Sequence, residues 1–278
     1  MLHAIDLPNF GDYGDPQLLA ELAGEAEDHG WDGFFMWDHI IAPDAMPVAD
    51  TTVALAAIAL KTRHIRFGPM VIPLPRRSPW KVAREAVTLD HLSNGRLILG
   101  IGLGGDWFAE LSTFGLPLND VMRAEQLDEG LAILAALMSG EEATHQGKHY
   151  TIKSTRFFPV PIQKRIPIWI AATWPRPRPF RRAAKYDGVA PISPDLETDL
   201  SVGQMHEVRT LIAKNRRSAA PFDIIQFGIT AGRSREKDAD KVAAFAEAGA
   251  TWWLEAPSPW KSTIAQVRER IRFGPPKI

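Results

Sequence analysis

The sequence predicts an α/β fold of the (β/α)8 TIM-barrel class. Short apolar runs typical of buried strands alternate with longer runs of helical periodicity from one end of the chain to the other. Eight such pairs, at about 35 residues each, match the arithmetic of a closed barrel. No linker rich in Gly, Ser or Pro divides the chain, so we expect one domain over residues 1–278. A doubly wound open sheet is the alternative fold.

Composition excludes several classes of function. The 32 Lys and Arg residues balance 33 Asp and Glu residues, for a net charge of −1, which argues against nucleic-acid binding as the main activity. The chain has no cysteine, so disulfide scaffolds, thiolate metal sites and iron–sulfur clusters are excluded. No signal peptide is visible, and the longest apolar run, residues 53–60, is too short to span a bilayer. We therefore expect a cytoplasmic protein whose redox chemistry depends on a borrowed cofactor.

The predicted strands are short apolar runs that end at proline, glycine or polar residues. The second strand carries two adjacent phenylalanines, and the third is ended by Pro73 and Pro75. Eight ranges are assigned to strands: residues 3–7, 33–37, 65–72, 96–101, 166–171, 187–192, 222–230 and 251–254.

The predicted helices begin at capping residues. Asp15 and Pro16 supply an N-cap and a first-turn proline, the apolar face that follows repeats at i, i+3, i+4 and i+7, and Gly30 ends the helix. Residues 140–165 are the least regular stretch, with a hairpin expected around Gly147. Further helices are expected from Asp50 to Leu60, from Pro79 to Ser93, over 121–138 and 179–185, up to about 215, and over 236–247 and 261–272.

The working residues of a barrel lie where a strand ends and a loop leads to the next helix. Trp37, Asp38 and His39 directly follow the second predicted strand. Strand alternation places Trp37 and His39 on one side and Asp38 on the other. Because imidazole titrates near neutrality, His39 is a candidate proton donor to a reacting ring. The alternative is that Asp38 caps the loop and His39 binds a backbone carbonyl, with no catalytic role.

A glycine run follows the fourth strand. Residues 100–105 match G-x-G-x-x-G, a fingerprint of dinucleotide binding, but the motif follows the fourth strand rather than the first, and a proline interrupts the segment before the next helix. We expect Gly102 and Gly104 to let the backbone approach a flat ligand, with tight strand packing as the alternative. Of the two carboxylates that follow, Asp106 and Glu110, we assign Glu110 to the pocket.

Arginines gather after the third and fifth strands. The loop from Thr173 through Trp174 precedes a helix N-terminus, where backbone N–H groups favour a phosphate. We therefore expect a phosphate clamp here, with a solvated basic helix face as the alternative for the last two arginines of the set. The set comprises Arg76, Arg77, Arg176, Arg178, Arg181 and Arg182.

No metal site is predicted. The strand ends lack the cluster of carboxylates and histidines that such a site needs. His145 and His149 have the i, i+4 spacing of some zinc ligands, but Gly147 interrupts them and no third ligand is near. We assign these histidines to a surface loop.

Six segments form a specific pattern when they are taken together. They include the run Arg66-Phe-Gly-Pro-Met-Val-Ile-Pro73 and the run Thr88-Leu-Asp-His-Leu-Ser-Asn-Gly-Arg96. The six segments are residues 30–39, 66–79, 86–104, 158–163, 166–171 and 183–188. This pattern resembles the bacterial luciferase-like monooxygenase superfamily over roughly the first 190 residues, with a looser similarity beyond.

The resemblance implies a luciferase-like TIM barrel that binds FMN, or the deazaflavin coenzyme F-420, at the carboxyl ends of the strands. It implies that Asp38 and His39 border the ring, that a bulged cis peptide near Met70-Val71 supports it, and that the loop after the fifth strand holds the phosphate. Many members have Gly-Gly where this chain has Ala171-Ala172, so the backbone there approaches the ligand less closely. The catalytic residues are expected to be His39 and Asp38, and the cofactor-binding residues Trp37, Met70, Val71, Gly102, Gly104, Glu110, Ala171, Ala172, Thr173, Trp174 and Arg176.

The resemblance also implies the activity. The first expectation is an FMN-dependent monooxygenase that takes reduced flavin from a separate reductase and uses oxygen on a small organic substrate. The first alternative is a deazaflavin-dependent oxidoreductase that transfers hydride, which the Asp38–His39 pair and the arginines favour. The second is a barrel that binds a flavin without turnover. A homodimer without nucleic-acid or membrane partners is expected, and residues 104–120 and 140–165 are candidates for a lid.

Overall fold

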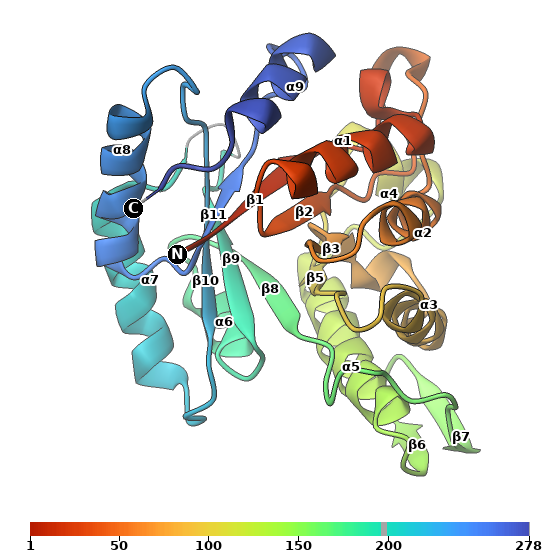
Figure 1. Ribbon diagram of the computed structural model, residues 1–278. Coiled ribbons are helices and arrows are strands. Elements are labelled where there is room, and N and C mark those ends of the chain that lie inside the picture. Colours follow the sequence, from red (N-terminus) through yellow and green to blue (C-terminus); the bar gives the residue numbers. More distant parts are fainter. Residues whose placement is uncertain (196–198, 278) are drawn as a thin grey trace.

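A parallel sheet of nine strands curls into a barrel in the computed structural model, which describes residues 1–195 and 199–277 (Figure 1). Neighbouring strands follow the order β3-β2-β1-β11-β10-β9-β8-β5-β4. The edges of this sheet meet, because Ile98 N–H donates to the Phe67 carbonyl at 2.9 Å and Phe67 pairs in parallel with Leu97. The predicted barrel is confirmed, and an open sheet is wrong. The strands are β1 (Leu2–Leu7), β2 (Gly33–Met36), β3 (Arg66–Pro69), β4 (Ile72–Pro73), β5 (Leu99–Gly102), β8 (Ile168–Thr173), β9 (Gly188–Ile192), β10 (Asp223–Gly228) and β11 (Trp252–Glu255).

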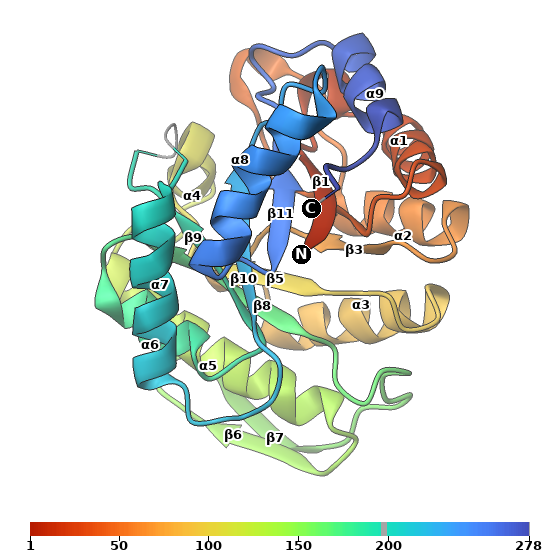
Figure 2. The same cartoon turned by 60° about the vertical axis from the view of Figure 1, so that its left-hand side comes forward.

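Helices surround the barrel, and a separate hairpin of β6 (Ala143–Gln146) and β7 (Thr151–Thr155) lies beside α5 (Figures 1 and 2). This is the hairpin expected around Gly147. Within the described ranges, no helix is long and apolar enough to cross a membrane. The helices are α1 (Pro16–Asp28), α2 (Thr51–Lys61), α3 (Pro79–Leu92), α4 (Glu110–Thr113), α5 (Asp120–Met138), α6 (Pro177–Ala183), α7 (Val202–Asn215), α8 (Arg235–Ala248) and α9 (Ile264–Phe273), with single 3-10 turns η1 (Gly11–Tyr13), η2 (Pro43–Ala45), η3 (Leu74–Arg76) and η4 (Trp107–Ala109).

Local capping explains where the helices begin. The Asp15 side chain accepts a hydrogen bond from the N–H of Gln17 at 2.8 Å, as predicted for the start of α1. The last helix begins three residues later than expected because Thr263 and Gln266 form a reciprocal capping box there. The short helix α4 was not predicted, since its four residues are too few to show a helical period.

A plug of aromatic side chains fills the barrel below its carboxyl end. The ring centroids of Phe35 and Trp169 lie 5.1 Å apart, and those of Trp169 and Trp252 lie 5.2 Å apart. These three side chains are fully buried and belong to an inner cluster that is separate from the larger core between strands and helices. The barrel is therefore solid at its centre, and a ligand has access only at an end.

The third barrel strand is interrupted between β3 and β4. The Met70–Val71 peptide bond is cis, at the position that the family resemblance implied. Opposite this break, a Cβ atom on Gly100 would lie 2.3 Å from the Pro69 carbonyl oxygen, and one on Gly102 would lie 2.6 Å from a methyl carbon of Val71. Tight packing of the third strand against β5 therefore requires both glycines.

Candidate active site

The carboxyl ends of the strands form a mouth lined by the side chains of Asp6, Trp37, Val71, Ala171 and Phe227. Strand alternation places these residues on the inner face, above the aromatic plug. Val71, Ala171 and Phe227 are only half-buried, although they point into the barrel. The mouth is therefore the part of the barrel interior that remains open to a ligand.

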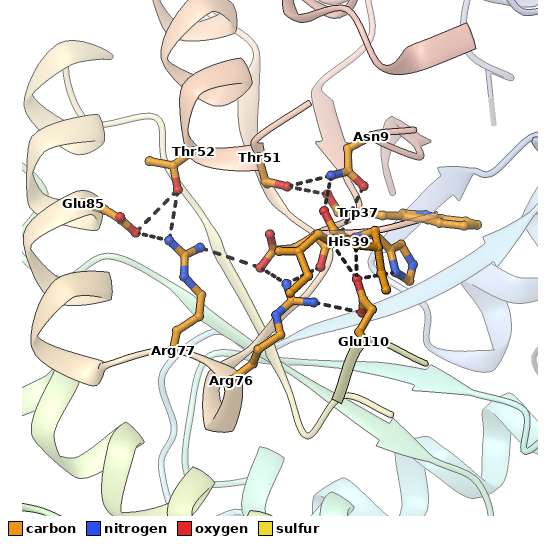
Figure 3. A network of polar contacts seen from close by, with 12 residues as sticks. Asn9, Trp37, His39, Thr51, Thr52, Arg76, Arg77, Glu85 and Glu110 are labelled. Atoms are coloured by element: carbon orange, nitrogen blue, oxygen red, sulfur yellow. Dashed lines mark hydrogen bonds and ion pairs between the residues drawn. The ribbon is translucent and has the colours of Figure 1, made fainter. Parts of the chain in front are cut away.

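Glu110, the first residue of α4, is the centre of a polar network beside the mouth (Figure 3). Its Oε1 atom accepts a hydrogen bond from the Ile40 N–H at 2.6 Å and lies 3.3 Å from His39 Nδ1. Its Oε2 atom accepts a hydrogen bond from the Arg76 guanidinium at 2.9 Å. The carboxylate of Glu110 thus joins three segments that follow different strands.

The surroundings of Glu110 keep it ionised. Burial by itself raises its pKa, but the neighbouring His39 imidazole, the hydrogen bond from the Ile40 N–H and the charge of Arg76 together bring the pKa below its ordinary value. A carboxylate beside Nδ1 favours the tautomer that carries its proton on that nitrogen. The Nε2 atom of His39 is then left as the proton acceptor. The network therefore prepares His39 as a general base, and as a general acid after it takes up a proton.

Asp38 faces away from the mouth, as strand alternation predicted. Its Oδ2 atom lies 3.0 Å from an Arg76 nitrogen and 3.7 Å from an Arg77 nitrogen. Arg77 in turn pairs with Glu85 at 2.7 Å, and the Arg76 side chain is 4% exposed. Asp38 therefore acts on the site by holding Arg76 in place, which makes it a positioning residue rather than one that reaches the reacting atoms.

Asn9 fixes the backbone of His39. Its amide donates to the carbonyl oxygens of His39 and Ala49 at 2.8 Å each, and its side-chain oxygen accepts from the His39 N–H at 3.1 Å. Asn9 is completely buried. Sequence reasoning missed this residue, although a polar side chain two residues after the first strand was a usable signal.

Aromatic rings enclose His39. The ring of Phe108 lies 4.9 Å from the imidazole by centroid distance, and that of Phe10 lies 5.5 Å from it. Trp260, from the loop after β11, is 5.7 Å from Phe10. Phe108 is held there with a φ of 54°, a left-handed conformation that costs a residue with a side chain about 1–3 kcal/mol. Phe10 and Trp260 were missed because they meet only when β1 and β11 become neighbours.

The loop after β8 differs from the phosphate clamp that was expected. Prolines at positions 175, 177 and 179 remove three amide donors, and α6 has only seven residues. An anion there would depend on guanidinium groups, and in the described parts of the chain no partner pairs with those of Arg176 and Arg178. The Trp174 ring packs edge-on against Phe180 at 5.9 Å, on the helix side of the strand.

Several predicted cofactor-binding residues lie in different surroundings. Ala172 is fully buried in the outer core, so its side chain cannot line the mouth, whereas Ala171 does. Met70 belongs to the inner plug. A Cβ atom on Gly104 would lie 2.6 Å from the Cβ of Pro73, so this glycine serves a close chain contact. Thr173 is the last residue of β8 and is half-buried.

The histidines of the hairpin are paired with carboxylates. His145 Nε2 lies 3.2 Å from Glu129 Oε2, and His149 Nε2 lies 2.9 Å from Glu125 Oε2. Among the residues whose placement is described, no group of three or more His, Asp or Glu side chains could hold a metal ion. The hairpin is therefore tied to α5 by these two pairs.

One side of the mouth is apolar. Two half-buried apolar side chains, Val71 and Ala171, flank Gly102 of β5, which adds no side chain between them, so one side of the mouth presents a continuous apolar surface. On the inner face of β1, the buried Oδ1 atom of Asp6 has no hydrogen-bond partner among the described residues. The carboxyl end of the barrel thus brings together an imidazole enclosed by aromatic rings, an apolar surface and exposed arginines.

Comparison with known proteins identifies the family. A family model described as luciferase-like monooxygenase matches residues 4–274. The chain therefore belongs to the luciferase-like monooxygenase family. An F420-dependent glucose-6-phosphate dehydrogenase of Microbacterium testaceum is 31% identical over 170 residues, which are 58% of this chain and 48% of that protein. The chain thus spans about half the length of the curated relatives that it matches.

Solved structures share the fold at low sequence identity. An F420-dependent secondary alcohol dehydrogenase in complex with an F420-acetone adduct has a TM-score of 0.81 at 15% identity, over 98% of this chain and 96% of that one. A type II Baeyer–Villiger monooxygenase of Pseudomonas putida in complex with FMN has a TM-score of 0.77 at 15% identity, over the same shares of the two chains. Proteins named for either cofactor therefore share this barrel.

Proposed function

We propose that this chain is a deazaflavin-dependent oxidoreductase that moves hydride between the bound cofactor and a small organic substrate. The observation that carries the proposal is the His39 imidazole, held at 3.3 Å by the buried, ionised Glu110 beside an apolar mouth. Relatives named F420-dependent glucose-6-phosphate dehydrogenase, 31% and 30% identical over the matched segments, support the deazaflavin. The sequence alone placed FMN first, and because of these relatives we place the deazaflavin first.

When bound, the oxidised deazaflavin supplies a hydride acceptor. Oxidation of an alcohol also releases the hydroxyl proton, and His39 Nε2 is the acceptor that the network leaves available. The imidazolium that results is stabilised by the Glu110 carboxylate, which Arg76 holds in place at 2.9 Å. In the reverse direction His39 returns the proton to the carbonyl oxygen, so that one residue serves both directions.

Two other features suit this function. The rings of Phe10 and Phe108 lie against the imidazole, Trp260 packs on those two rings, and together they reduce the access of water to a hydride-transfer step. Arg176 and Arg178 leave positive charge exposed near the end of β8, where it can attract an anionic cofactor tail.

FMN-dependent oxygenation is the second candidate function. The similarity of the fold to the FMN complex of the Baeyer–Villiger monooxygenase favours it. His39 would then donate a hydrogen bond at the reacting centre, and reduced FMN would come from a separate reductase. A barrel that binds the ring without turnover is the third candidate.

Parallel binding titrations with FMN and the deazaflavin coenzyme test the proposal. We expect micromolar or tighter binding of the deazaflavin, weaker binding of FMN, and anaerobic turnover with a panel of small alcohols and sugar phosphates. His39→Ala and Glu110→Gln should keep cofactor affinity within about threefold and lose turnover by about 10²–10⁴-fold. Binding of FMN alone with oxygen-dependent turnover would support the second candidate. If a ring binds without turnover and His39→Ala leaves its affinity unchanged, the third candidate is supported. If neither ligand binds, the enzyme proposal is refuted.

A further inference from the structure

The barrel contains two aspartate–tryptophan pairs, one at each end. At the mouth, Asp6 Oδ2 accepts a hydrogen bond from the Trp37 indole at 3.0 Å. At the amino end of the strands, Asp223 Oδ2 accepts one from the Trp169 indole at 3.1 Å, and its Oδ1 accepts another from the Thr251 hydroxyl at 3.1 Å. The distal pair has both oxygens satisfied, whereas Oδ1 of Asp6 is buried without a partner in the described chain. Of the four carboxyl oxygens in these two pairs, the one without a hydrogen bond is Asp6 Oδ1, at the mouth.

Among the described residues, no cationic side chain pairs with the carboxyl group of Asp6. On β1 itself, His3 lies on the opposite face of the strand, and on β11, Glu255 also faces outward, where it pairs with Arg270 at 3.2 Å. Asp6 is 3% exposed, and burial raises its pKa to about 7 although the hydrogen bond from Trp37 opposes the change. A large share of Asp6 is therefore an uncharged carboxylic acid at neutral pH.

The other ionisable groups at the mouth are already engaged. His39, after β2, contacts Glu110, which begins α4, and Arg76, after β4, binds the same carboxylate. Trp37, the neighbour of Asp6 on the β2 side, is neutral. An uncharged carboxyl group can donate a hydrogen bond, which an ionised one cannot, and a buried polar atom without a partner is costly in the absence of a ligand.

We propose that the uncharged carboxyl group of Asp6 donates a hydrogen bond from Oδ1 to an acceptor atom of the tricyclic ring bound at the mouth. Asp6 is then a cofactor-binding residue that selects rings with a carbonyl oxygen or an unprotonated ring nitrogen at that edge. The inference rests on the proposed function only in requiring a flavin-type ring at the mouth. The claim that the Asp6 carboxyl group is protonated concerns the free protein, so it is tested without any ligand.

Infrared difference spectra of the free protein test the protonation state. Wild type minus Asp6→Asn should show the carbonyl band of a protonated carboxyl group at pH 6, and this band should fade with a midpoint near pH 7. Asp223→Asn is the matched control, because it alters the same kind of pair at the far end of the barrel. If the difference spectrum between wild type and Asp6→Asn shows no band of a protonated carboxyl group at pH 6, the inference is overturned, whatever the protein binds.

Dissociation constants for FMN and the deazaflavin coenzyme at pH 6 and pH 8.5 test the hydrogen bond. For the ring that binds, the dissociation constant of wild type should rise between pH 6 and pH 8.5 by a factor about ten times larger than that of Asp6→Asn. The reason is that asparagine keeps an N–H donor and does not titrate. Asp6→Leu, which removes the donor, should bind about fivefold to tenfold more weakly than wild type at pH 6, and Asp223→Asn should match wild type.

The outcomes separate the two proposals. The hydrogen bond is overturned, and the proposed function left intact, by either of two results. One is that the ring affinity of Asp6→Asn depends on pH as that of wild type does; the other is that Asp6→Leu binds the ring as tightly as wild type at pH 6. If wild type binds neither ring, the proposed function and the hydrogen bond both fail, while the infrared midpoint still reports the state of Asp6. If Asp6→Leu does not fold, the pH dependence of Asp6→Asn decides alone.

Discussion

Replacement of Arg76 by methionine tests whether the buried ion network stabilises the protein. The guanidinium is 4% exposed and contacts two carboxylates, at 3.0 Å on Asp38 and 2.9 Å on Glu110. Removal of one partner from a buried ion pair costs about 3–5 kcal/mol, because the remaining charge is left without compensation. At about 2 °C per kcal/mol for a chain of this length, the melting temperature should fall by about 6–10 °C at pH 7.

The loss should depend on pH in a stated direction. The pKa of Glu110 is lowered in the folded protein, so its contribution to stability is present above the ordinary carboxyl pKa and disappears as the pH falls through the lowered value. Without Arg76 the pKa of Glu110 rises. The difference in melting temperature between wild type and Arg76→Met should therefore become smaller as the pH falls from 7 to about 4. Thermal melts followed by circular dichroism measure the gap, with Arg272→Met, which breaks an exposed pair with Glu25, as the control that should change by less than about 2 °C. A gap that is equally wide at both pH values would refute the electrostatic reasoning.

Three further substitutions give separate tests. Gly102→Ala should destabilise by about 1–3 kcal/mol in a denaturant melt and weaken cofactor binding, because its Cβ would lie 2.6 Å from a neighbouring methyl, whereas Gly203→Ala, with no atom nearer than 3.9 Å, should be neutral or stabilising. Asn9→Ala should lower kcat more than cofactor affinity, since three hydrogen bonds that set the His39 and neighbouring backbone are lost; an unchanged kcat would contradict that role. Glu110→Gln should lower kcat/KM by about 10²-fold or more while cofactor affinity changes little, because the carboxylate that orients the imidazole is lost, and a kcat/KM equal to that of wild type would contradict the pairing at 3.3 Å.

The fold was predictable because each of its parts has a local signal. The cap at Asp15 and the apolar face that follows it specify α1 without reference to the rest of the chain. The alternation after β2 correctly separated Asp38 from His39. The interruption of the third strand between Met70 and Val71 followed from the family resemblance, since a cis peptide has no signature in residue type alone.

The site was predictable only where a single segment carries it. The contact between Glu110 and Arg76 joins residues 34 positions apart, and either side chain taken alone resembles an ordinary loop charge. Trp260 meets Phe10 only because the last strand pairs with the first. In the loop after β8, the exposed arginines suit an anion, but three prolines remove the amide donors that a helix N-terminus would supply.

The placement of Glu110 two residues after Phe108 has a mechanical consequence. The ring of Phe108 shields the imidazole, and the carboxylate of Glu110 lies 3.3 Å from Nδ1 of the same imidazole. Any shift that swings this short stretch outward to admit a molecule also withdraws the counter-ion. Access to His39 and its pairing with a carboxylate therefore depend on the same three residues of the chain.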